Sequence, residues 1–146
     1  MKTALYPGSF DPWHKGHQDI LVKALSVFDK VIVAVTDNHA KKPETLPEER
    51  VATIVAKNYG RVNCTNRVKV ICSSEMLPNL ASQTNADVVI RGIRNGDDLS
   101  KEQMQQYWYE DLGMKVPVVY FVSDRTLVHM SSSAVKLVNK FGKEDF

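Results

Sequence analysis

Short apolar segments alternate along this chain with longer amphipathic ones. Three of the apolar segments are rich in Val and Ile and show no regular alternation of polar and apolar positions. Such runs are typical of strands that are covered on both faces. The predicted strands are residues 3–6, 31–35, 68–71, 88–90 and 116–122.

The amphipathic stretches predict five helices. In residues 18–28 the apolar side chains fall on one helical face. Residues 46–57 predict a second helix, with Thr45-Leu46-Pro47-Glu48 as its capping box. The other predicted helices are residues 77–84, residues 98–112, ended by Gly113, and residues 132–141, ended by Gly142. Residues 60–67 are expected to form a polar loop.

Strands and helices in strict alternation predict a parallel sheet with right-handed crossovers. We therefore expect an α/β fold, a doubly wound Rossmann-like domain with a five-stranded parallel sheet in the order 3-2-1-4-5 and helices on both faces. The sequence shows no repeat, low-complexity tract or linker, so residues 1–146 are interpreted as one domain.

Composition and charge narrow the possible partners. The chain has 146 residues, of which 43% are hydrophobic and 25% charged, and its net charge is +2. A balance so close to neutral argues against a general nucleic-acid binder. No apolar stretch approaches the roughly 18 residues of a membrane span. The two cysteines, Cys64 and Cys72, lack metal-ligand spacing and cannot make a disulfide framework, which favours a cytoplasmic protein.

The segment after the first predicted strand, residues 6–17, carries the strongest chemical signal. Gly8 would let the backbone turn sharply, and Gly16 would let it approach a ligand closely. His14 and His17 bracket that second glycine where a helix begins, and the free amides and the dipole of a helix start favour an anion. This H-x-G-H pattern predicts a phosphate site with imidazole donors. The alternative is an ordinary loop with two unrelated histidines.

Two further groups would lie at the same edge of the sheet, where the winding reverses. Arg91 and Arg94 flank a glycine after the fourth strand and could clamp a phosphate, unless they pair with the nearby acids Asp97, Asp98 and Glu102. Residues 131–133 are three serines that open the last helix, where they could bind a triphosphate or simply cap the helix. Lys41 and Lys42 follow the second strand and would more often be solvated.

The motifs together resemble those of a known family. Gly8-Ser9-Phe10-Asp11-Pro12 followed by His14-Lys15-Gly16-His17 is similar to the signature of the H-x-G-H nucleotidylyltransferases. Within that superfamily the chain most resembles the bacterial phosphopantetheine adenylyltransferases. The supporting segments are Lys41-Lys42-Pro43 with Glu48-Glu49-Arg50-Val51-Ala52, Ile90-Arg91-Gly92-Ile93-Arg94, and Ser131-Ser132-Ser133-Ala134-Val135-Lys136. It departs from them at His14, where Thr is common, in residues 125–130, which lack an expected aromatic, and in ending at Phe146 without a further helix.

The resemblance implies an enzyme that transfers AMP from ATP to 4′-phosphopantetheine, giving dephospho-CoA and pyrophosphate. It implies catalytic roles for His17, Ser9 and Lys41, and an acceptor site formed by Ser9, Lys41, Leu77 and Arg91. The ATP-binding residues that it implies are Gly8, Ser9, Phe10, His14, Gly16, His17, Gly92, Arg94, Glu102, Ser131, Ser132 and Ser133. Magnesium would enter with ATP, held through phosphates and water, so no protein ligand is named. The family resemblance also implies a homo-oligomer, and a hexamer in particular.

Two other functions remain open at this point. His14 slightly favours a related transferase that uses nicotinamide mononucleotide or a polyol phosphate as acceptor. A nucleotide-binding regulatory module without turnover is the third hypothesis, although binding alone would not require both imidazoles and acceptor-phosphate groups. His39, His129 and both cysteines are interpreted as bystanders, and the aromatic run of residues 107–109 as packing or a subunit contact.

Overall fold

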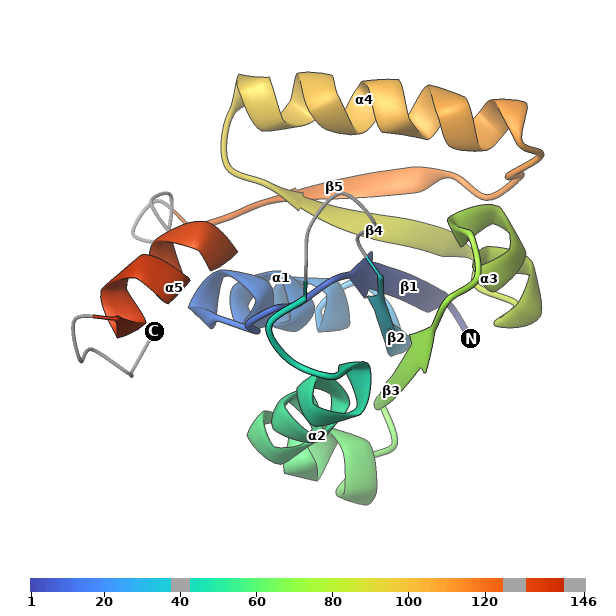
Figure 1. Cartoon of the computed structure of the whole chain (residues 1–146). Helices are drawn as coiled ribbons and strands as arrows, with labels where there is room; N and C mark the ends of the chain where they lie inside the picture. The colour runs from blue at the N-terminus through green and yellow to red at the C-terminus, as the bar shows by residue number, and fades with distance from the viewer. Residues whose placement is uncertain (38–42, 125–130, 141–146) are drawn as a thin grey trace.

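The computed structural model describes residues 1–37, 43–124 and 131–140, and a five-stranded parallel sheet lies at its centre (Figure 1). The strands are β1 (Thr3–Gly8), β2 (Lys30–Thr36), β3 (Val68–Ser73), β4 (Val88–Ile93) and β5 (Val118–Val122). They lie in the order β3-β2-β1-β4-β5, and each neighbouring pair is parallel. The predicted sheet, including its order, is confirmed.

The middle of the sheet is the most deeply buried part of the chain. In β2 all five residues from Val31 to Val35 are buried, and β1 is buried from Ala4 to Pro7. Strand β3, at one edge, is only partly buried. Apolar runs without alternation therefore do mark strands that are covered on both faces.

Two strands run further than the sequence predicts, and both extensions lead into the functional site. The ladder with β2 includes Pro7 and Gly8 of β1, and the ladder with β5 includes Arg91 and Gly92 of β4. None of these residues favours a strand by itself. Pairing with neighbouring strands decides their conformation, and this is not visible in local sequence.

Four helices fill the crossovers and a fifth follows the sheet. They are α1 (Lys15–Leu25), α2 (Pro47–Lys57), α3 (Leu77–Gln83), α4 (Gly96–Asp111) and α5 (Ser132–Asn139). Helix α4 starts after the cap Asn95 and ends before Gly113, whose φ of 95° stops it as predicted. Within the described residues, no helix has both the length and the apolar character needed to cross a bilayer.

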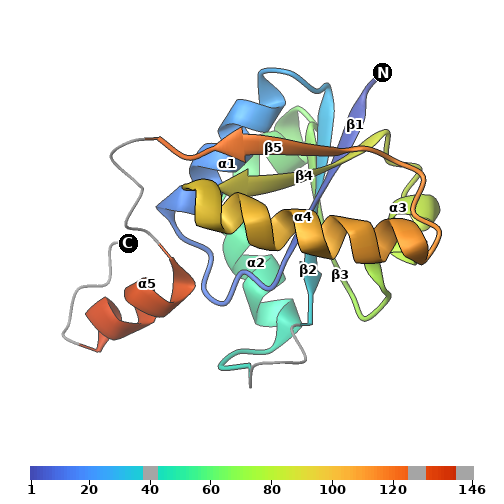
Figure 2. The same ribbon diagram turned by 90° about the horizontal axis from the view of Figure 1, so that it is seen from above.

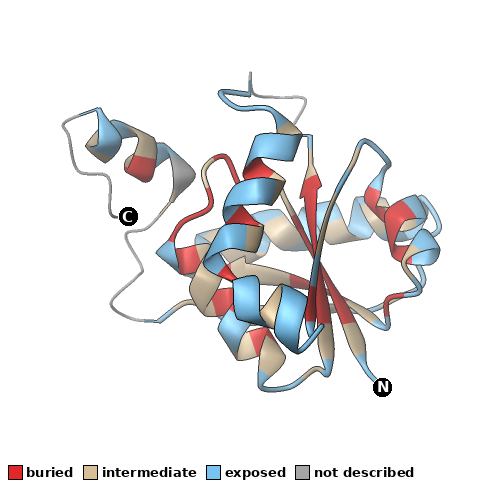
Figure 3. Cartoon of the chain, turned by 90° about the horizontal axis from the view of Figure 1, so that it is seen from below, coloured by how far each residue is buried: buried red, intermediate tan, exposed pale blue. Residues whose placement is uncertain are grey.

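Helices cover both faces of the sheet, as predicted (Figure 2). On one face α1 and α2 contribute Ile20, Leu21, Ala24 and Ile54 to a buried apolar cluster with the strands. On the other face α3 contributes Leu77, Leu80 and Ala81, and Tyr109 of α4 packs against them. Figure 3 shows that buried residues concentrate in the strands and on the helix sides that face them.

Two local predictions are wrong. Residues Gly60–Cys64, expected to be loop, form a single π-helical turn, labelled η1, directly after α2. The expected capping box is absent, because Leu46 is the residue that precedes α2 and no side chain caps this helix end. The Thr45 hydroxyl instead donates to Asp11 Oδ1 at 3.0 Å, so a tertiary contact has taken the group that a local cap would use.

Candidate active site

Two cavities open where β1 and β4 end, and they share a wall. The tyrosine cavity, about 490 Å³, includes Tyr109 and Tyr120 in its lining, and the histidine cavity, about 520 Å³, includes His14 and His17. The residues common to both linings are Pro7, Gly8, Ser9, Arg91 and Glu102. Because β1 and β4 are adjacent at the point where the winding reverses, this is the place where a doubly wound sheet binds ligands. Two ligands can meet there at one shared wall.

The histidine cavity gathers the residues predicted to bind ATP. Its lining includes Gly8, Ser9, Phe10, His14, Gly16, His17, Gly92, Arg94, Glu102, Ser131 and Ser133. Ser132 begins α5, but its side chain lies outside what the structure describes. Residues from three distant parts of the chain thus converge on one cavity, as a single ligand site requires.

A strained turn follows β1. Phe10 has a φ of 48°, a region that bulky side chains rarely adopt. Its buried ring packs edge-on against Tyr6, Trp13 and His17, with ring centres 5.1, 4.9 and 5.0 Å away. A Cβ on Gly8 would lie 2.8 Å from the same ring. The sharp turn that the sequence assigns to Gly8 is therefore made at Phe10, and the glycine supplies room for the ring.

The two histidines hold each other in place at the start of α1. His14 caps the helix, its Nδ1 accepting hydrogen bonds from the amides of Gly16 at 3.1 Å and His17 at 3.4 Å. His17 Nδ1 accepts from the amide of His14 at 3.1 Å, and the two rings stack 3.7 Å apart. Since both Nδ1 atoms are acceptors, each neutral ring carries its proton on Nε2.

That capping changes what the site offers an anion. The amides of Gly16 and His17, expected to be free, are occupied by the ring of His14. The imidazole Nε2–H groups are the donors that remain, and both rings line the histidine cavity. The predicted imidazole donors are therefore geometrically available, but the expected free amides are not.

Burial keeps both rings neutral. It lowers the pKa of His14 to about 4, and the charges of Arg94 and Lys57 add to the effect. It also holds the pKa of His17 well below its usual range, with His14 and Arg91 contributing. At neutral pH the site thus presents two uncharged imidazole donors, and its positive charge comes from the guanidinium groups.

Both arginines are paired with acids of α4. Arg91 donates from Nε and Nη2 to the two carboxylate oxygens of Glu102, at 3.0 and 2.9 Å. Arg94 donates from Nε and Nη2 to Asp98, at 2.9 and 3.2 Å, and its hydrogen bonds hold the pKa of that carboxyl below its usual range. The ion pairs considered as the alternative are therefore present. They also fix the two guanidiniums in place, Arg91 between the cavities and Arg94 in the histidine cavity alone.

The serine run is divided between capping and the cavity. Ser131 is the N-cap of α5, and its Oγ accepts from the amide of Ala134 at 3.1 Å. The same hydroxyl keeps its own proton to donate, and Ser131 lines the histidine cavity with the exposed Ser133. The capping interpretation is correct for Ser131 and compatible with ligand binding.

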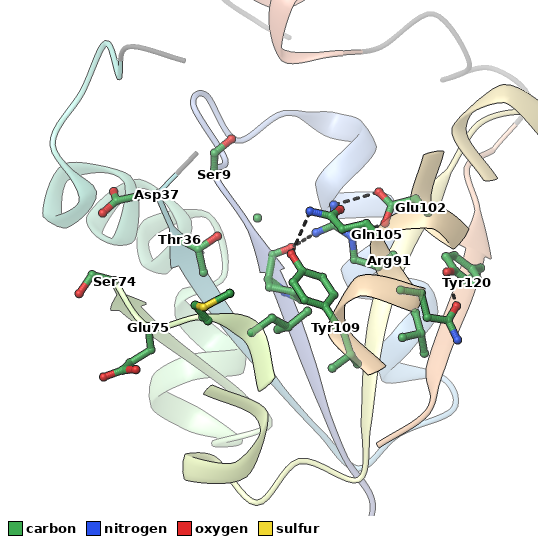
Figure 4. Close-up of a pocket in the computed structure, with 17 residues that line it drawn as sticks. Ser9, Thr36, Asp37, Ser74, Glu75, Arg91, Glu102, Gln105, Tyr109 and Tyr120 are labelled. Carbon is green, nitrogen blue, oxygen red and sulfur yellow. Dashed lines mark hydrogen bonds and ion pairs between the residues drawn. The ribbon is translucent and has the colours of Figure 1, made fainter. Parts of the chain in front are cut away.

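The tyrosine cavity holds the described residues that were predicted to bind the acceptor, Ser9, Leu77 and Arg91 (Figure 4). It also holds residues that the sequence analysis missed. The Tyr109 hydroxyl accepts a hydrogen bond from Gln105 at 2.9 Å, and the Tyr120 hydroxyl donates to Gln106 at 2.7 Å.

A sequence signal for these residues exists. Glu102, Gln105, Gln106 and Tyr109 are spaced i, i+3, i+4 and i+7, which places them on one side of α4. Because most of them are polar, they do not stand out as an inward face. Tyr109, expected to serve packing or a subunit contact, does pack on the core and also lines the cavity.

Asp11 ties the turn after β1 to two other segments. Its carboxylate accepts from the amide of Glu44 at 2.9 Å and the hydroxyl of Thr45 at 3.0 Å, and Lys136 of α5 lies 3.7 Å away. Burial alone would raise the pKa of Asp11, but the bonds from residues 44 and 45 and the nearby charges hold it below its usual range. This carboxylate connects α5, which carries the serines, to the histidine turn.

A buried amide pair supports the same turn from beneath. Gln18 donates to Asn58 at 2.6 Å and accepts from it at 3.1 Å, while the Trp13 indole donates to Gln18 at 3.0 Å. The sequence gave no indication of this pair, since two amides 40 positions apart form no pattern.

The remaining predictions fall partly outside the described residues. Lys41, Lys42, His39 and His129 lie there, so the structure places none of them. Cys64 and Cys72 are both free. Across residues 1–37, 43–124 and 131–140, no group of three or more His, Cys, Asp or Glu side chains is placed to hold a metal ion.

Comparison with known proteins agrees with this geometry. A family profile described as "Cytidylyltransferase-like" matches residues 5–138. The phosphopantetheine adenylyltransferase of Mycoplasma mycoides subsp. mycoides is 36% identical over 144 residues, covering 98% of this chain and 100% of that protein. The enzyme of the same name from Clostridium perfringens is 38% identical over 144 residues, covering 99% and 85%.

A solved structure supports the fold independently. The lipopolysaccharide core biosynthesis protein from Thermoplasma volcanium superposes with a TM-score of 0.61 at 20% identity, over 85% of this chain and 98% of that one. The structural match shows the shared fold, and the sequence matches show the kinship. The chain belongs to the cytidylyltransferase-like family of nucleotidyltransferases, among the phosphopantetheine adenylyltransferases.

Proposed function

We propose that this chain transfers AMP from ATP to 4′-phosphopantetheine, producing dephospho-CoA and pyrophosphate in coenzyme A biosynthesis. The observation that carries the proposal is the wall shared by the two cavities, since a group transfer needs both substrates at one point. ATP occupies the histidine cavity and the acceptor occupies the tyrosine cavity. Ser9 and Arg91 then stand where the two phosphates meet.

The chemistry requires positioning more than proton transfer. A phosphate monoester is already ionised at neutral pH, so its oxygen can attack the α-phosphorus of ATP without a general base. Catalysis then consists of in-line alignment and of stabilising charge on the transferring group. The Nε2–H of His17 donates to the α-phosphate, and the hydroxyl of Ser9 orients the attacking oxygen.

The arginines and serines bind the remaining charges. Arg91, with Lys41, holds the acceptor phosphate, while Arg94 and the serines of residues 131–133 hold the β- and γ-phosphates. Glu102 takes two donors of Arg91 and lines both cavities, so it fixes that guanidinium and lies within reach of the ATP ribose. Side chains fixed before substrate arrives lose little entropy on binding.

Magnesium enters with the nucleotide in this proposal. Two carboxylates line the histidine cavity, Asp98 and Glu102, and each is engaged by an arginine. The donor set therefore fits an ion held by phosphate oxygens and water better than one held by protein ligands. When bound, the ion neutralises charge on the triphosphate and on departing pyrophosphate.

His14 does not favour a different acceptor. Its ring caps α1, and capping a helix is the usual task of Thr, the residue common at this position in the family that the sequence resembles. The substitution thus keeps the local function. It gives no support to nicotinamide mononucleotide or a polyol phosphate as the acceptor.

An acceptor panel tests the proposal. Pyrophosphate release from ATP is measured with 4′-phosphopantetheine, nicotinamide mononucleotide and glycerol 3-phosphate in separate reactions. We expect release with the first compound alone. Release with either of the others in its place would assign a different transferase, and no release with any acceptor would favour the non-catalytic module.

We also propose that the chain acts as a homo-oligomer in the cytoplasm, a hexamer if it assembles as that family does. Helix α4 leaves four large apolar side chains exposed, Met104, Tyr107, Trp108 and Leu112. Apolar surface of this kind tends to mark an interface. Light scattering after size exclusion gives the mass, and 16.5 kDa at micromolar concentration would contradict assembly.

A further inference from the structure

Arg50 is a buried cation that the mechanism above does not use. It lies in the first turn of α2 and is 5% exposed. Among the described residues it forms no ion pair with an acid within 4.0 Å, and its Nε has no hydrogen-bond partner. Burying a charge is costly, so a guanidinium kept in such a place points to a specific task.

Its two terminal nitrogens bind backbone carbonyls next to the shared wall. Nη1 donates to the carbonyl of Ser9 at 2.6 Å, and Nη2 donates to the carbonyl of Thr45 at 3.1 Å. Arg91 donates to the carbonyl of Pro7 at 2.5 Å. The end of β1 is therefore held on both sides of Gly8 by guanidiniums from two different elements.

The bond to Ser9 lies directly before the strained residue of the turn. Phe10 has a φ of 48°, and a bulky side chain stays in that region only where its surroundings hold it. The aromatic contacts of Phe10 fix one side of the turn, and the Arg50 hydrogen bond fixes the carbonyl that precedes it. Without that bond the peptide between residues 9 and 10 is free to rotate, which would move the Ser9 hydroxyl.

We propose that Arg50 is a positioning residue for adenylyl transfer, which aims the Ser9 hydroxyl at the attacking phosphate by holding the Ser9 carbonyl. This inference rests on the proposed function, because it needs a reaction whose rate depends on Ser9. The guanidinium fork matters as well as the charge, since one head group must reach two carbonyls at once.

Arg67 provides a matched control. It too donates to backbone carbonyls, those of Leu25, Phe28 and Asp29, at 2.5, 3.0 and 3.1 Å. It immediately precedes β3, at the end of the sheet opposite the shared wall, and lines neither cavity. A substitution there disturbs a similar set of hydrogen bonds without touching Ser9.

The experiment compares R50M, R50K, R67M, S9A and the double variant S9A/R50M in the full chain. The measurements are kcat, the KM values for ATP and acceptor, and the thermal unfolding midpoint. We expect R50M to lower kcat about 10²-fold, the effect of a misplaced reacting group, with a KM for ATP within about twofold of wild type. R67M should lower the unfolding midpoint and leave kcat within about twofold.

The double variant separates positioning from general support. If Arg50 acts through Ser9, its loss costs little once Ser9 is gone, and S9A/R50M should be within about threefold of S9A in kcat. Losses that multiply would overturn the inference, as would an R50M enzyme with unchanged kcat. R50K keeps the charge but not the fork, so we expect roughly a tenfold loss, and full activity in R50K would also contradict the proposal.

These results do not depend on whether R50M folds. Should it fail to do so, R50K and S9A/R50K are judged by the same two criteria. Failure of the proposed function has a different signature, since the wild-type chain would then transfer AMP to another acceptor or to none. With another acceptor the same comparison is made on that reaction, and without any transfer the inference is refuted with the function on which it rests.

Discussion

Replacing His17 by Ala removes the Nε2–H donor that the mechanism places at the α-phosphate. The same change deletes a helix-capping bond, because His17 Nδ1 accepts from the amide of His14. It also removes a ring that packs 5.0 Å from Phe10 and 5.3 Å from Trp13. The variant should therefore lose both rate and stability, and the two losses can be measured separately.

The expected magnitudes differ enough to distinguish them. Loss of one preorganised transition-state donor lowers kcat by about 10²- to 10³-fold. An unpartnered amide costs about 1–3 kcal/mol, and each aromatic contact about 0.5–1.5 kcal/mol. The free energy of unfolding should therefore fall by about 2–4 kcal/mol, against a typical total of about 5–15 kcal/mol, so the variant stays folded at 25 °C.

The assay is steady-state pyrophosphate release, with ATP affinity measured by calorimetry on the same preparation. We expect kcat to fall while the Kd for ATP changes by less than about threefold, because the donor acts mainly in the transition state. Equal losses in kcat and ATP affinity would mean that His17 binds ground state and transition state alike. That result would refute the role assigned to it.

Three further predictions follow from the same geometry. Arg91→Ala should mainly raise KM for the acceptor and Arg94→Ala mainly KM for ATP, as read from initial rates with each substrate varied; unchanged KM values for both would contradict the phosphate contacts. Because the pKa of His14 falls from 6.5 to about 4 on folding, the unfolded chain binds the extra proton, and the free energy of unfolding should fall by about 3 kcal/mol as the pH drops from 6.5 to 4. Urea titrations at several pH values check this, and His14→Thr, which can still cap the helix, should make the fall shallower. Gly8→Ala would push a methyl group to 2.8 Å from the Phe10 ring and should cost about 1–3 kcal/mol in a thermal melt, whereas an unchanged midpoint would show that the ring moves aside freely.

Local pattern was enough to predict the fold. The strands of the sheet centre are apolar throughout, and the helices between them are amphipathic, so class, order and helix faces follow from periodicity and crossover rules. The ends of the elements do not follow in the same way. Pro7, Gly8, Arg91 and Gly92 are in strands because neighbouring strands pair with them.

The candidate site shows the same division. The histidine turn and the arginines were recognisable, since their residue types and spacing are unusual outside phosphate sites. The residues that hold them were not. Arg50, Asp11 and Asn58 act through contacts 33 to 41 positions away in sequence, and each looks like an ordinary surface residue in its own segment. A supporting contact of this kind becomes visible only in three dimensions.

The most direct test of the account follows the α-phosphate of ATP. Wild-type enzyme in excess is mixed with ATP labelled at the α-phosphorus and with 4′-phosphopantetheine, and the products are separated after a single turnover. Direct transfer predicts that the label appears in dephospho-CoA at the rate at which pyrophosphate is released, with none on the protein. Label retained on the protein, or released as free AMP, would contradict an in-line transfer between two substrates that meet at Ser9 and Arg91.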